Sequence, residues 1–224
     1  MLKVQNIIKN YGKLQVLKGI DLHIQKGEIV SVVGASGAGK STLLHIAGTL
    51  DRPDSGKVFI AGQEVTSLNE KQLAAFRNEK IGFIFQFHNL MAEFTALENV
   101  CIPAFIGNKP EKEVKERAKE LLEMLNLQHR MNNLPSQMSG GEQQRTAVAR
   151  ALINSPSIIF ADEPSGNLDS KNAQELHRLF FTLREKFDQT FVIVTHNEEL
   201  AAMADRKLVM QDGFLVKTDG IHQN

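Results

Sequence analysis

A glycine-rich segment near the start of the chain constrains the fold more than any other feature of the sequence. Residues 34–41 read Gly-Ala-Ser-Gly-Ala-Gly-Lys-Ser, follow the apolar residues 29–33 and precede an amphipathic run over residues 42–50. This spacing is typical of a loop whose backbone N–H groups cradle phosphates between a buried strand and the first turn of a helix. The expected phosphate-binding residues are Gly34, Ala35, Ser36, Gly37, Ala38, Gly39 and Lys40, and Ser41 is the expected ligand of Mg²⁺.

The order of the other predicted elements places this loop in an α/β fold. Residues 20–25 alternate apolar and polar side chains, as a half-buried antiparallel strand does, and residues 111–127 have helical spacing. Strands and helices alternate in the last third, over residues 157–161, 171–187, 190–194, 198 onward, 208–210 and 214–216. Such alternation predicts a largely parallel sheet with helices on both faces. In the helix over 171–187 the expected core residues are Leu176, Leu179, Phe180, Leu183 and Phe187.

Composition narrows the class of protein. The 224 residues include 26 Lys or Arg and 26 Asp or Glu, and the resulting net charge of +0 disfavours general attachment to nucleic acid or anionic lipid. Cys101 is the one cysteine, which excludes an intrachain disulfide and favours a reducing compartment. The sequence contains neither a signal peptide nor a run of about 20 apolar residues. We therefore expect a soluble, cytosolic, globular chain with one large domain or two small ones.

Two carboxylates and a histidine follow other predicted strands. Asp162 and Glu163 end one apolar strand, and His196 follows another. Because ligands bind beyond the carboxyl ends of strands in open α/β sheets, we expect these side chains near the phosphate loop. Adjacent strand residues point to opposite sides, so one carboxylate is expected to hold Mg²⁺ and the other to orient or deprotonate a water molecule. The histidines interpreted as solvent-exposed background or, for His45, as a spacer are His23, His45, His88, His129, His177 and His222.

A second candidate anion site opens another predicted helix. Ser139-Gly140-Gly141-Glu142 combines a glycine turn, a hydroxyl and a helix N-terminus. Together with residues 165–169, this motif resembles the ATP-binding cassette (ABC) ATPases, and the resemblance covers essentially the whole chain. It implies a P-loop NTPase with a mostly parallel core sheet, an N-terminal antiparallel β-subdomain and an inserted α-helical subdomain. The implied single domain spans residues 1–224, with a nucleotide-binding core from 1–86 and 157–224 and a helical subdomain over 87–156.

The resemblance also implies roles for individual residues. In the family, two cassettes enclose two ATP molecules head to tail, each between the phosphate loop of one subunit and the Ser-Gly-Gly segment of the other. By this resemblance Tyr11 stacks on adenine, Gln86 contacts Mg²⁺ and water, Asp162 holds the metal, Glu163 is the catalytic base and His196 senses the γ-phosphate. The residues it assigns to nucleotide binding in a homodimer are Gly34 to Ser41 with Thr42 on one subunit, and Ser139, Gly140, Gly141, Glu142 and Asp169 at the interface.

Two positions depart from the family's commoner residues. Met138 stands where Leu is more common, and Glu142 where Gln is more common. Neither change removes a backbone N–H donor or the serine hydroxyl. We therefore expect an intact ATPase that uses ATP and Mg²⁺.

Shorter motifs resemble one branch of the family, which contains lipoprotein-releasing, macrolide-exporting and cell-division cassettes. These motifs are residues 48–53, 97–100, 140–142 and 166–169. The resemblance implies that ATP-driven closure of the dimer is coupled to lipoprotein release from the inner membrane. A regulatory role in cell division and the ATPase role in another exporter remain alternatives.

The same resemblance implies the surroundings of the chain. Because the chain ends where the cassette ends, we expect separate integral membrane permease subunits, lipoprotein cargo handled indirectly and no nucleic acid. The chain itself is expected to be peripheral, on the cytoplasmic face of the bacterial inner membrane. The apolar residues 87–106, in which Pro103 is expected to interrupt regular structure, are either ordinary core or the surface that grips the membrane partner.

Overall fold

The computed structural model describes residues 1–220. The strands are β1 Leu2–Tyr11, β2 Leu14–Ile24, β3 Ile29–Val33, β4 Ser55–Ile60, β5 Gln63–Glu64, β6 Ile81–Phe85, β7 Ile158–Asp162, β8 Thr190–Val194, β9 Arg206–Gln211 and β10 Phe214–Gly220. The helices are α1 Lys40–Ala47, α2 Glu70–Lys80, α3 Ala96–Ile106, α4 Glu111–Met124, α5 Gly140–Leu152, α6 Ser170–Phe187 and α7 Glu198–Met203, with short 3₁₀ turns at Gln128–Arg130 and Pro135–Gln137. None of the helices over residues 1–220 is both long and apolar enough to cross a membrane.

The strands form two sheets. The first has the order β2-β1-β4-β5 and is antiparallel, and the second has the order β10-β9-β3-β8-β7-β6. In the second sheet five strands, β9, β3, β8, β7 and β6, run parallel to one another. Only β10, which pairs with β9, is antiparallel. The predicted α/β fold with an antiparallel N-terminal sheet is therefore confirmed. Because β3, β7 and β8 run the same way, the segments that follow them lie at one edge of the sheet.

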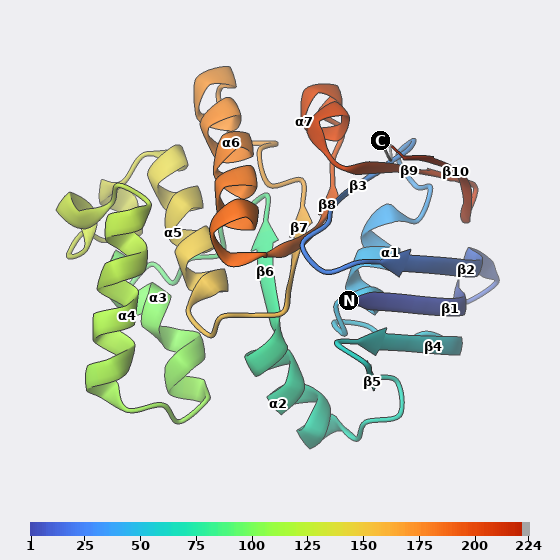
Figure 1. Cartoon of the computed structure of the whole chain (residues 1–224), viewed down its shortest axis with the longest axis horizontal. Helices are drawn as coiled ribbons and strands as arrows, with labels where there is room; N and C mark the ends of the chain where they lie inside the picture. Colours follow the sequence, from blue (N-terminus) through green and yellow to red (C-terminus); the bar gives the residue numbers. More distant parts are fainter. Residues whose placement is uncertain (221–224) are drawn as a thin grey trace.

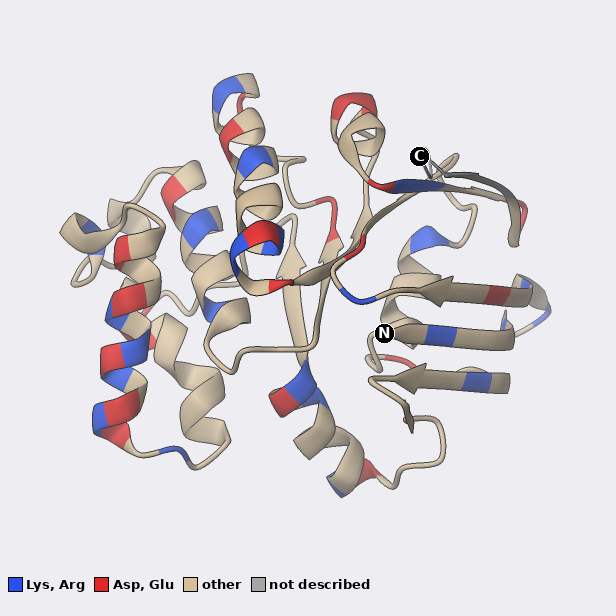
Figure 2. Ribbon diagram, in the orientation of Figure 1, with Lys and Arg blue, Asp and Glu red and all other residues tan. Residues whose placement is uncertain are grey.

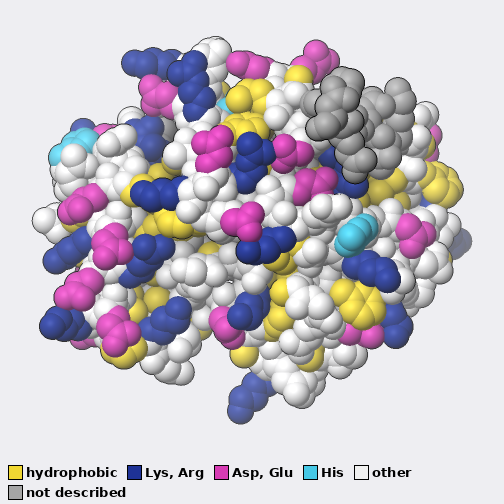
Figure 3. Space-filling view, viewed as in Figure 1, with side chains coloured by type: hydrophobic (Ala, Val, Ile, Leu, Met, Phe, Trp, Pro, Cys, Tyr) yellow, Lys and Arg dark blue, Asp and Glu magenta, His cyan; other side chains and the backbone are white. Residues whose placement is uncertain are grey.

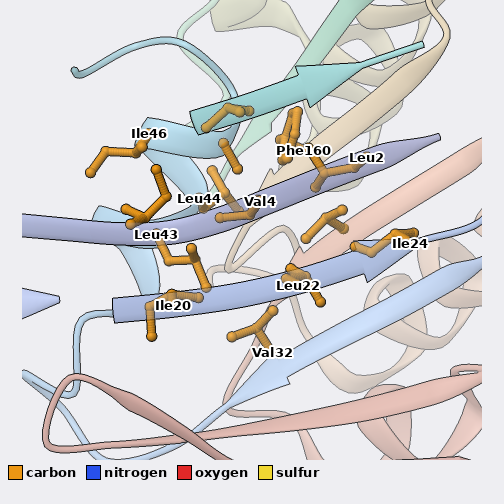
Figure 4. Close-up of a cluster of buried hydrophobic side chains, with 14 of the residues drawn as sticks. Leu2, Val4, Ile20, Leu22, Ile24, Val32, Leu43, Leu44, Ile46 and Phe160 are labelled. Carbon is orange, nitrogen blue, oxygen red and sulfur yellow. The ribbon is translucent and has the colours of Figure 1, made fainter. Parts of the chain in front are cut away.

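Successive residues of the central strands belong to two separate hydrophobic cores. Val32 and Phe160 join the cluster between the two sheets, which also contains the buried face of α1. Figure 4 shows part of this cluster, with side chains of β1 (Leu2 and Val4) and of α1 (Leu43 and Leu44) among its members. Neighbouring strand residues, such as Ile159 and Ala161, join the other cluster, under α3 to α6. Burial on both faces explains why these strands are continuously apolar in the sequence.

Helices α3, α4 and α5 form a group that Figure 1 shows beyond β6, on the opposite side of the molecule from β1, β2 and β4. In α4 the predicted stripe Val114, Ala118, Leu121 and Leu122 is buried, and charged residues of both signs cover the rest of the helix (Figure 2). Charges of both signs are also interspersed over the face of the molecule in Figure 3.

Several details differ from the sequence-based expectations. Helix α3 continues through Pro103 instead of being interrupted there. Helix α2 and strand β6 were not predicted, and α2 begins with a capping box between Asn69 and Gln72. Phe187, expected in the core, is 38% exposed at the end of α6, where no layer covers it. His177, expected at the surface, is only 1% exposed because it lies on the buried face of α6. His88 is half-buried, and His222 lies outside the described residues.

Candidate nucleotide-binding site

The phosphate loop has the backbone that its glycines make possible. Gly34, Gly37 and Gly39 all have positive φ, and Gly39 is the N-cap of α1. At Gly34 a Cβ atom would lie 2.2 Å from the carbonyl oxygen of Met210, so a side chain has no room there. At Gly37 nothing obstructs a side chain, but its φ of +78° favours glycine. The loop therefore turns tightly after β3 and delivers its last residues to the N-terminus of α1, where an anion is stabilised.

Lys40 is buried against the loop that precedes it. Its Nζ atom donates hydrogen bonds to the carbonyl oxygens of Gly34, at 2.9 Å, and Ala35, at 3.0 Å. These bonds hold a positive charge beside the loop's backbone, where the phosphates of a nucleotide would lie. The arrangement can therefore offer a phosphate group both N–H donors and an ammonium ion.

Asp162, at the end of β7, lies beside the first turn of α1. Its Oδ1 accepts a hydrogen bond of 3.2 Å from the Ser41 hydroxyl. The His45 ring, interpreted as a spacer from the sequence, has Nε2 3.8 Å from Asp162 Oδ2. A hydroxyl and a carboxylate oxygen this close are the donor types that Mg²⁺ prefers, so these residues fit the predicted metal role.

Both carboxylate oxygens of Glu163 lie next to His196, which donates a hydrogen bond to one of them. The backbone N–H of His196 donates to Glu163 Oε2 at 3.1 Å, and the ring Nε2 of His196 lies 3.4 Å from Oε1. The backbone N–H of Glu163 donates to the carbonyl oxygen of Val194 at 2.9 Å, which ties the end of β7 to the end of β8. Glu163 has a φ of +48°, a conformation that costs energy outside glycine and is typical of functional sites.

Gln86 follows β6 and pairs with the loop that follows Glu163. Its Nε2 donates to Asn167 Oδ1 at 3.0 Å, and Asn167 Nδ2 donates back to the Gln86 carbonyl oxygen at 3.2 Å. A buried glutamine of α5, Gln144, adds a link that the sequence analysis missed. Its Nε2 donates to the carbonyl oxygens of Phe85, at 3.3 Å, and Pro164, at 2.6 Å. Gln144 thus joins the residue before Gln86 to the residue after Glu163.

Tyr11 is positioned by an acidic residue that the sequence analysis did not connect with it. Its hydroxyl donates to Asp51 Oδ2 at 2.7 Å, and Lys9 Nζ donates to Asp51 Oδ1 at 2.9 Å. Lys9 Nζ also lies 5.1 Å from the centre of the Tyr11 ring, within the range of a cation–π contact. The hydrogen bond to Asp51 raises the pKa of both Lys9 and Tyr11. The ring remains 51% exposed, so a flat ligand can stack on it.

The Ser-Gly-Gly segment begins α5 with a capping box. The Glu142 N–H donates to Ser139 Oγ at 3.3 Å, and the Ser139 N–H donates to Glu142 Oε2 at 2.7 Å. Arg130 Nε donates to the other carboxylate oxygen of Glu142 at 2.8 Å. Burial opposes ionisation of this carboxyl, but the hydrogen bonds from Ser139 and Arg130 prevail and lower its pKa to about 2. Glu142 therefore stabilises the N-terminus of the helix that Ser139 caps.

Part of the predicted site is assembled within one chain, and part lies apart from it. Helix α1 packs in the core between the two sheets, whereas α5 packs in the core on the other face of the parallel sheet. Positions Gly140 and Gly141 face Leu168 and Asn172, near Asp169, and a Cβ at Gly141 would lie 2.2 Å from Asn172 Oδ1. Asp169 caps α6 by accepting from the Asn172 N–H at 2.9 Å. The Ser-Gly-Gly segment and Asp169 thus form a second, separate group of predicted residues.

Comparisons with known proteins place the chain in a family. A model of the ABC transporter family matches residues 17–166. A lipoprotein-releasing system ATP-binding protein LolD from Cytophaga hutchinsonii is 64% identical over 96% of this chain and 99% of the relative. The LolD of Bacteroides fragilis is 59% identical over 96% of this chain and 100% of the relative.

Solved structures match over the full length as well. The dimeric structure of MJ0796, a bacterial ABC transporter cassette, has a TM-score of 0.91 and 40% identity, with 100% of both chains covered. A post-hydrolysis structure of the same cassette, bound to ADP and Pi, has a TM-score of 0.90 and 39% identity over 100% of both chains. The chain therefore belongs to the ABC transporter family, as one of its ATP-hydrolysing cassettes.

Proposed function

We propose that the chain is the ATPase subunit of a membrane complex that releases lipoproteins from the bacterial inner membrane. The observation that carries the ATPase role is the contact of Asp162 with Ser41 and of Glu163 with His196 at one edge of the sheet. The lipoprotein role is supported by LolD relatives at 58–64% identity that span nearly the whole chain. Residues 1–86 and 157–224 act as the nucleotide-binding core, and residues 87–156 as the helical subdomain.

Each group at the site has a role in this proposal. The loop Gly34–Ser41 and Thr42 bind the phosphates of ATP, and Ser41, Asp162 and Gln86 supply oxygen ligands for Mg²⁺, which neutralises phosphate charge when bound. Glu163 accepts the proton of the attacking water, since its carboxylate contacts His196. Its backbone follows β7, at the same end of the sheet as the phosphate loop. His196 senses the terminal phosphate.

The second group of predicted residues works on another copy of the chain. Ser139, Gly140, Gly141 and Glu142 form a capped N-terminus of α5, which packs in a different core from α1, and Asp169 begins a helix beside them. In a head-to-tail homodimer this segment covers the ATP held by the partner, so nucleotide joins the two copies. The dimeric structure of the similar cassette MJ0796 supports the formation of a dimer.

The permease partners bind at the exposed apolar side chains between β6 and the end of α3. Phe87 and Met91, in the loop after β6, and Ile106, at the end of α3, are 71%, 50% and 67% exposed, and exposed apolar side chains that gather in one region are typical of an interaction surface. A groove of about 370 Å³ adjoins one of them, since Ile106 lines it together with Phe85, Pro103 and residues of α2 and α5. It suits an amphipathic helix from an integral membrane subunit similar to LolC or LolE. The cassette is then peripheral, on the cytoplasmic face of the inner membrane, and handles lipoprotein cargo through these subunits.

Co-purification tests the transport role and this surface together. From detergent-solubilised membranes, the wild-type chain is expected to retain permease subunits that carry lipidated protein. Phe87→Ser is expected to reduce their recovery by about tenfold, because a buried aromatic contact is lost from the interface. The matched control is Phe187→Ser, another exposed phenylalanine but on α6, which should retain the partners. A membrane partner that carries no lipoprotein and binds cell-wall enzymes would instead support the regulatory alternative.

Asp51 is predicted to affect the binding of the base and not of the phosphates. Asp51→Ala removes the acceptor for Tyr11 and Lys9, so the ring loses its fixed orientation. We expect the Kd for ATP to rise about fivefold, which is on the order of 1 kcal/mol, as measured by titration calorimetry. The Kd for inorganic triphosphate, which has no base to stack, should stay unchanged. An equal loss for both ligands would show that Asp51 acts through the general structure of the site.

A further inference from the structure

The loop from Glu163 to Asp169 joins the proposed catalytic base to helix α6. Three of its seven residues are exposed, whereas Pro164 and Ser165 are buried. The Gly166 N–H donates to the Glu163 carbonyl oxygen at 3.0 Å, and the Leu168 N–H donates to the Ser165 carbonyl oxygen at 3.1 Å, so the loop is two consecutive tight turns. A left-handed residue such as Glu163 persists only where its surroundings hold it. The contacts of the two buried residues therefore help to position Glu163, together with its own hydrogen bonds to Val194 and His196.

The contact at Ser165 comes from a histidine that the proposed mechanism does not use. His177 Nε2 lies 3.0 Å from Ser165 Oγ, and the two residues are 1% and 8% exposed. His177 Nδ1 is buried and has no hydrogen-bond partner among the described residues. A buried N–H without an acceptor is costlier than an unused lone pair, so the favoured tautomer carries its proton on Nε2 and donates it to Ser165. Burial also lowers the pKa of His177, with partial opposition from Glu199, and this favours the neutral ring.

This bond complements the one at Pro164. Gln144 of α5 holds the Pro164 carbonyl oxygen, and His177 of α6 holds the side chain of the next residue. Two anchors on successive residues, from two different helices, fix both the position and the direction of the chain. Without the bond to His177, the segment is held by Gln144 at Pro164 and by the hydrogen bonds of Glu163 itself with Val194 and His196. The loss of one anchor loosens the backbone that carries the Glu163 carboxylate.

We propose that His177 is a positioning residue for hydrolysis, which holds Ser165 and thereby keeps the Glu163 carboxylate against His196. The inference rests on the proposed role of Glu163 as the base. His177 touches neither the nucleotide site nor Glu163, so its effect reaches the site through Ser165 and the backbone between residues 163 and 165. It should therefore change the rate of hydrolysis and leave nucleotide binding unchanged, because the phosphate loop and Tyr11 lie on other elements.

Steady-state ATPase assays on the full chain test this inference with three variants. His177→Leu removes the donor, Ser165→Ala removes its partner, and His177→Gln keeps an N–H that can reach Ser165. We expect the first two to lower kcat about tenfold with KM for ATP within about twofold, because a small misplacement of a catalytic group is costly. His177→Gln should keep at least about a third of the wild-type kcat. The double variant His177→Leu/Ser165→Ala should be no slower than either single variant, since both remove the same bond.

Controls separate this role from loss of fold and from failure of the proposed base. His23→Leu, at an exposed position of β2, should leave kcat unchanged. If His177→Leu does not fold, Ser165→Ala and His177→Gln still test whether the bond between His177 and Ser165 affects kcat, because these variants nearly keep the volume of the core. A wild-type kcat for Ser165→Ala, or His177→Gln as slow as His177→Leu, would overturn the inference. If Glu163→Gln is inactive in the same assay while Ser165→Ala is fully active, the role of His177 fails and the role of Glu163 stands.

Discussion

Glu163→Gln is expected to reduce ATP hydrolysis by about a hundredfold or more while ATP binding stays within about threefold of wild type. The glutamine can still accept the hydrogen bond from the His196 backbone, which is 3.1 Å long in the native chain, so the loop keeps its shape. It cannot take a proton from water at neutral pH. ATP should therefore persist between two copies of the chain. Single-turnover hydrolysis with ATP and Mg²⁺ measures whether the chemical step is slow. Light scattering under the same conditions measures whether a long-lived dimer forms.

The control for this variant is Glu185→Gln, an exposed carboxylate of α6 outside the site. It should hydrolyse ATP at the wild-type rate and should not accumulate a dimer. Rapid turnover by Glu163→Gln would remove Glu163 as the base and leave Asp162, Gln86 and His196 as the remaining polar groups there. A slow variant that stays monomeric with ATP would instead contradict the head-to-tail dimer and keep the base.

The parts of this molecule that could be predicted from the sequence are those with short, local causes. The phosphate loop needs glycines in fixed positions, as the missing room at Gly34 shows. The carboxylates and His196 follow apolar strands, and parallel strands that run the same way bring their ends together. Ser139 and Glu142 form a capping box within four consecutive residues, so the sequence motif alone is enough to predict this local structure.

The missed features depend on contacts between residues that are far apart in the chain. Tyr11 and Asp51 are on different sides of the phosphate loop in sequence, and only the pairing of β1 with its neighbours brings them together. Gln144 is a polar residue in a polar stretch, and nothing local shows that it is fully buried. His177 is different, because it falls at helical spacing with Ala173 and Phe180 on the buried face of α6. That spacing indicates burial, but the polar ring of histidine led to the expectation that His177 lies at the surface.

Lys40→Ala is the second change with a large expected effect, and it acts on binding instead of chemistry. The ammonium group lies on the carbonyl oxygens of Gly34 and Ala35, beside the place where phosphates bind, and no other lysine of the described chain contacts this loop. Two charge-assisted bonds to phosphate are together worth about 3 kcal/mol, so ATP affinity should fall roughly a hundredfold. Titration with a fluorescent ATP analogue in the presence of Mg²⁺ measures this loss.

Thermal unfolding shows whether the lost affinity comes from the site or from a damaged fold. ATP at a hundred times its Kd stabilises the wild-type chain by about 2.7 kcal/mol, and a hundredfold weaker Kd reduces this to about 0.4 kcal/mol. Without nucleotide, Lys40→Ala should unfold near the wild-type temperature, because the glycines that shape the loop are unchanged and alanine favours the first turn of α1. Lys71→Ala, exposed on α2, should keep the full ATP-induced shift. A Lys40→Ala variant that ATP stabilises as strongly as wild type would contradict the proposed role of the phosphate loop. It would also contradict the ATP-bridged dimer, because that dimer requires ATP to bind at this loop.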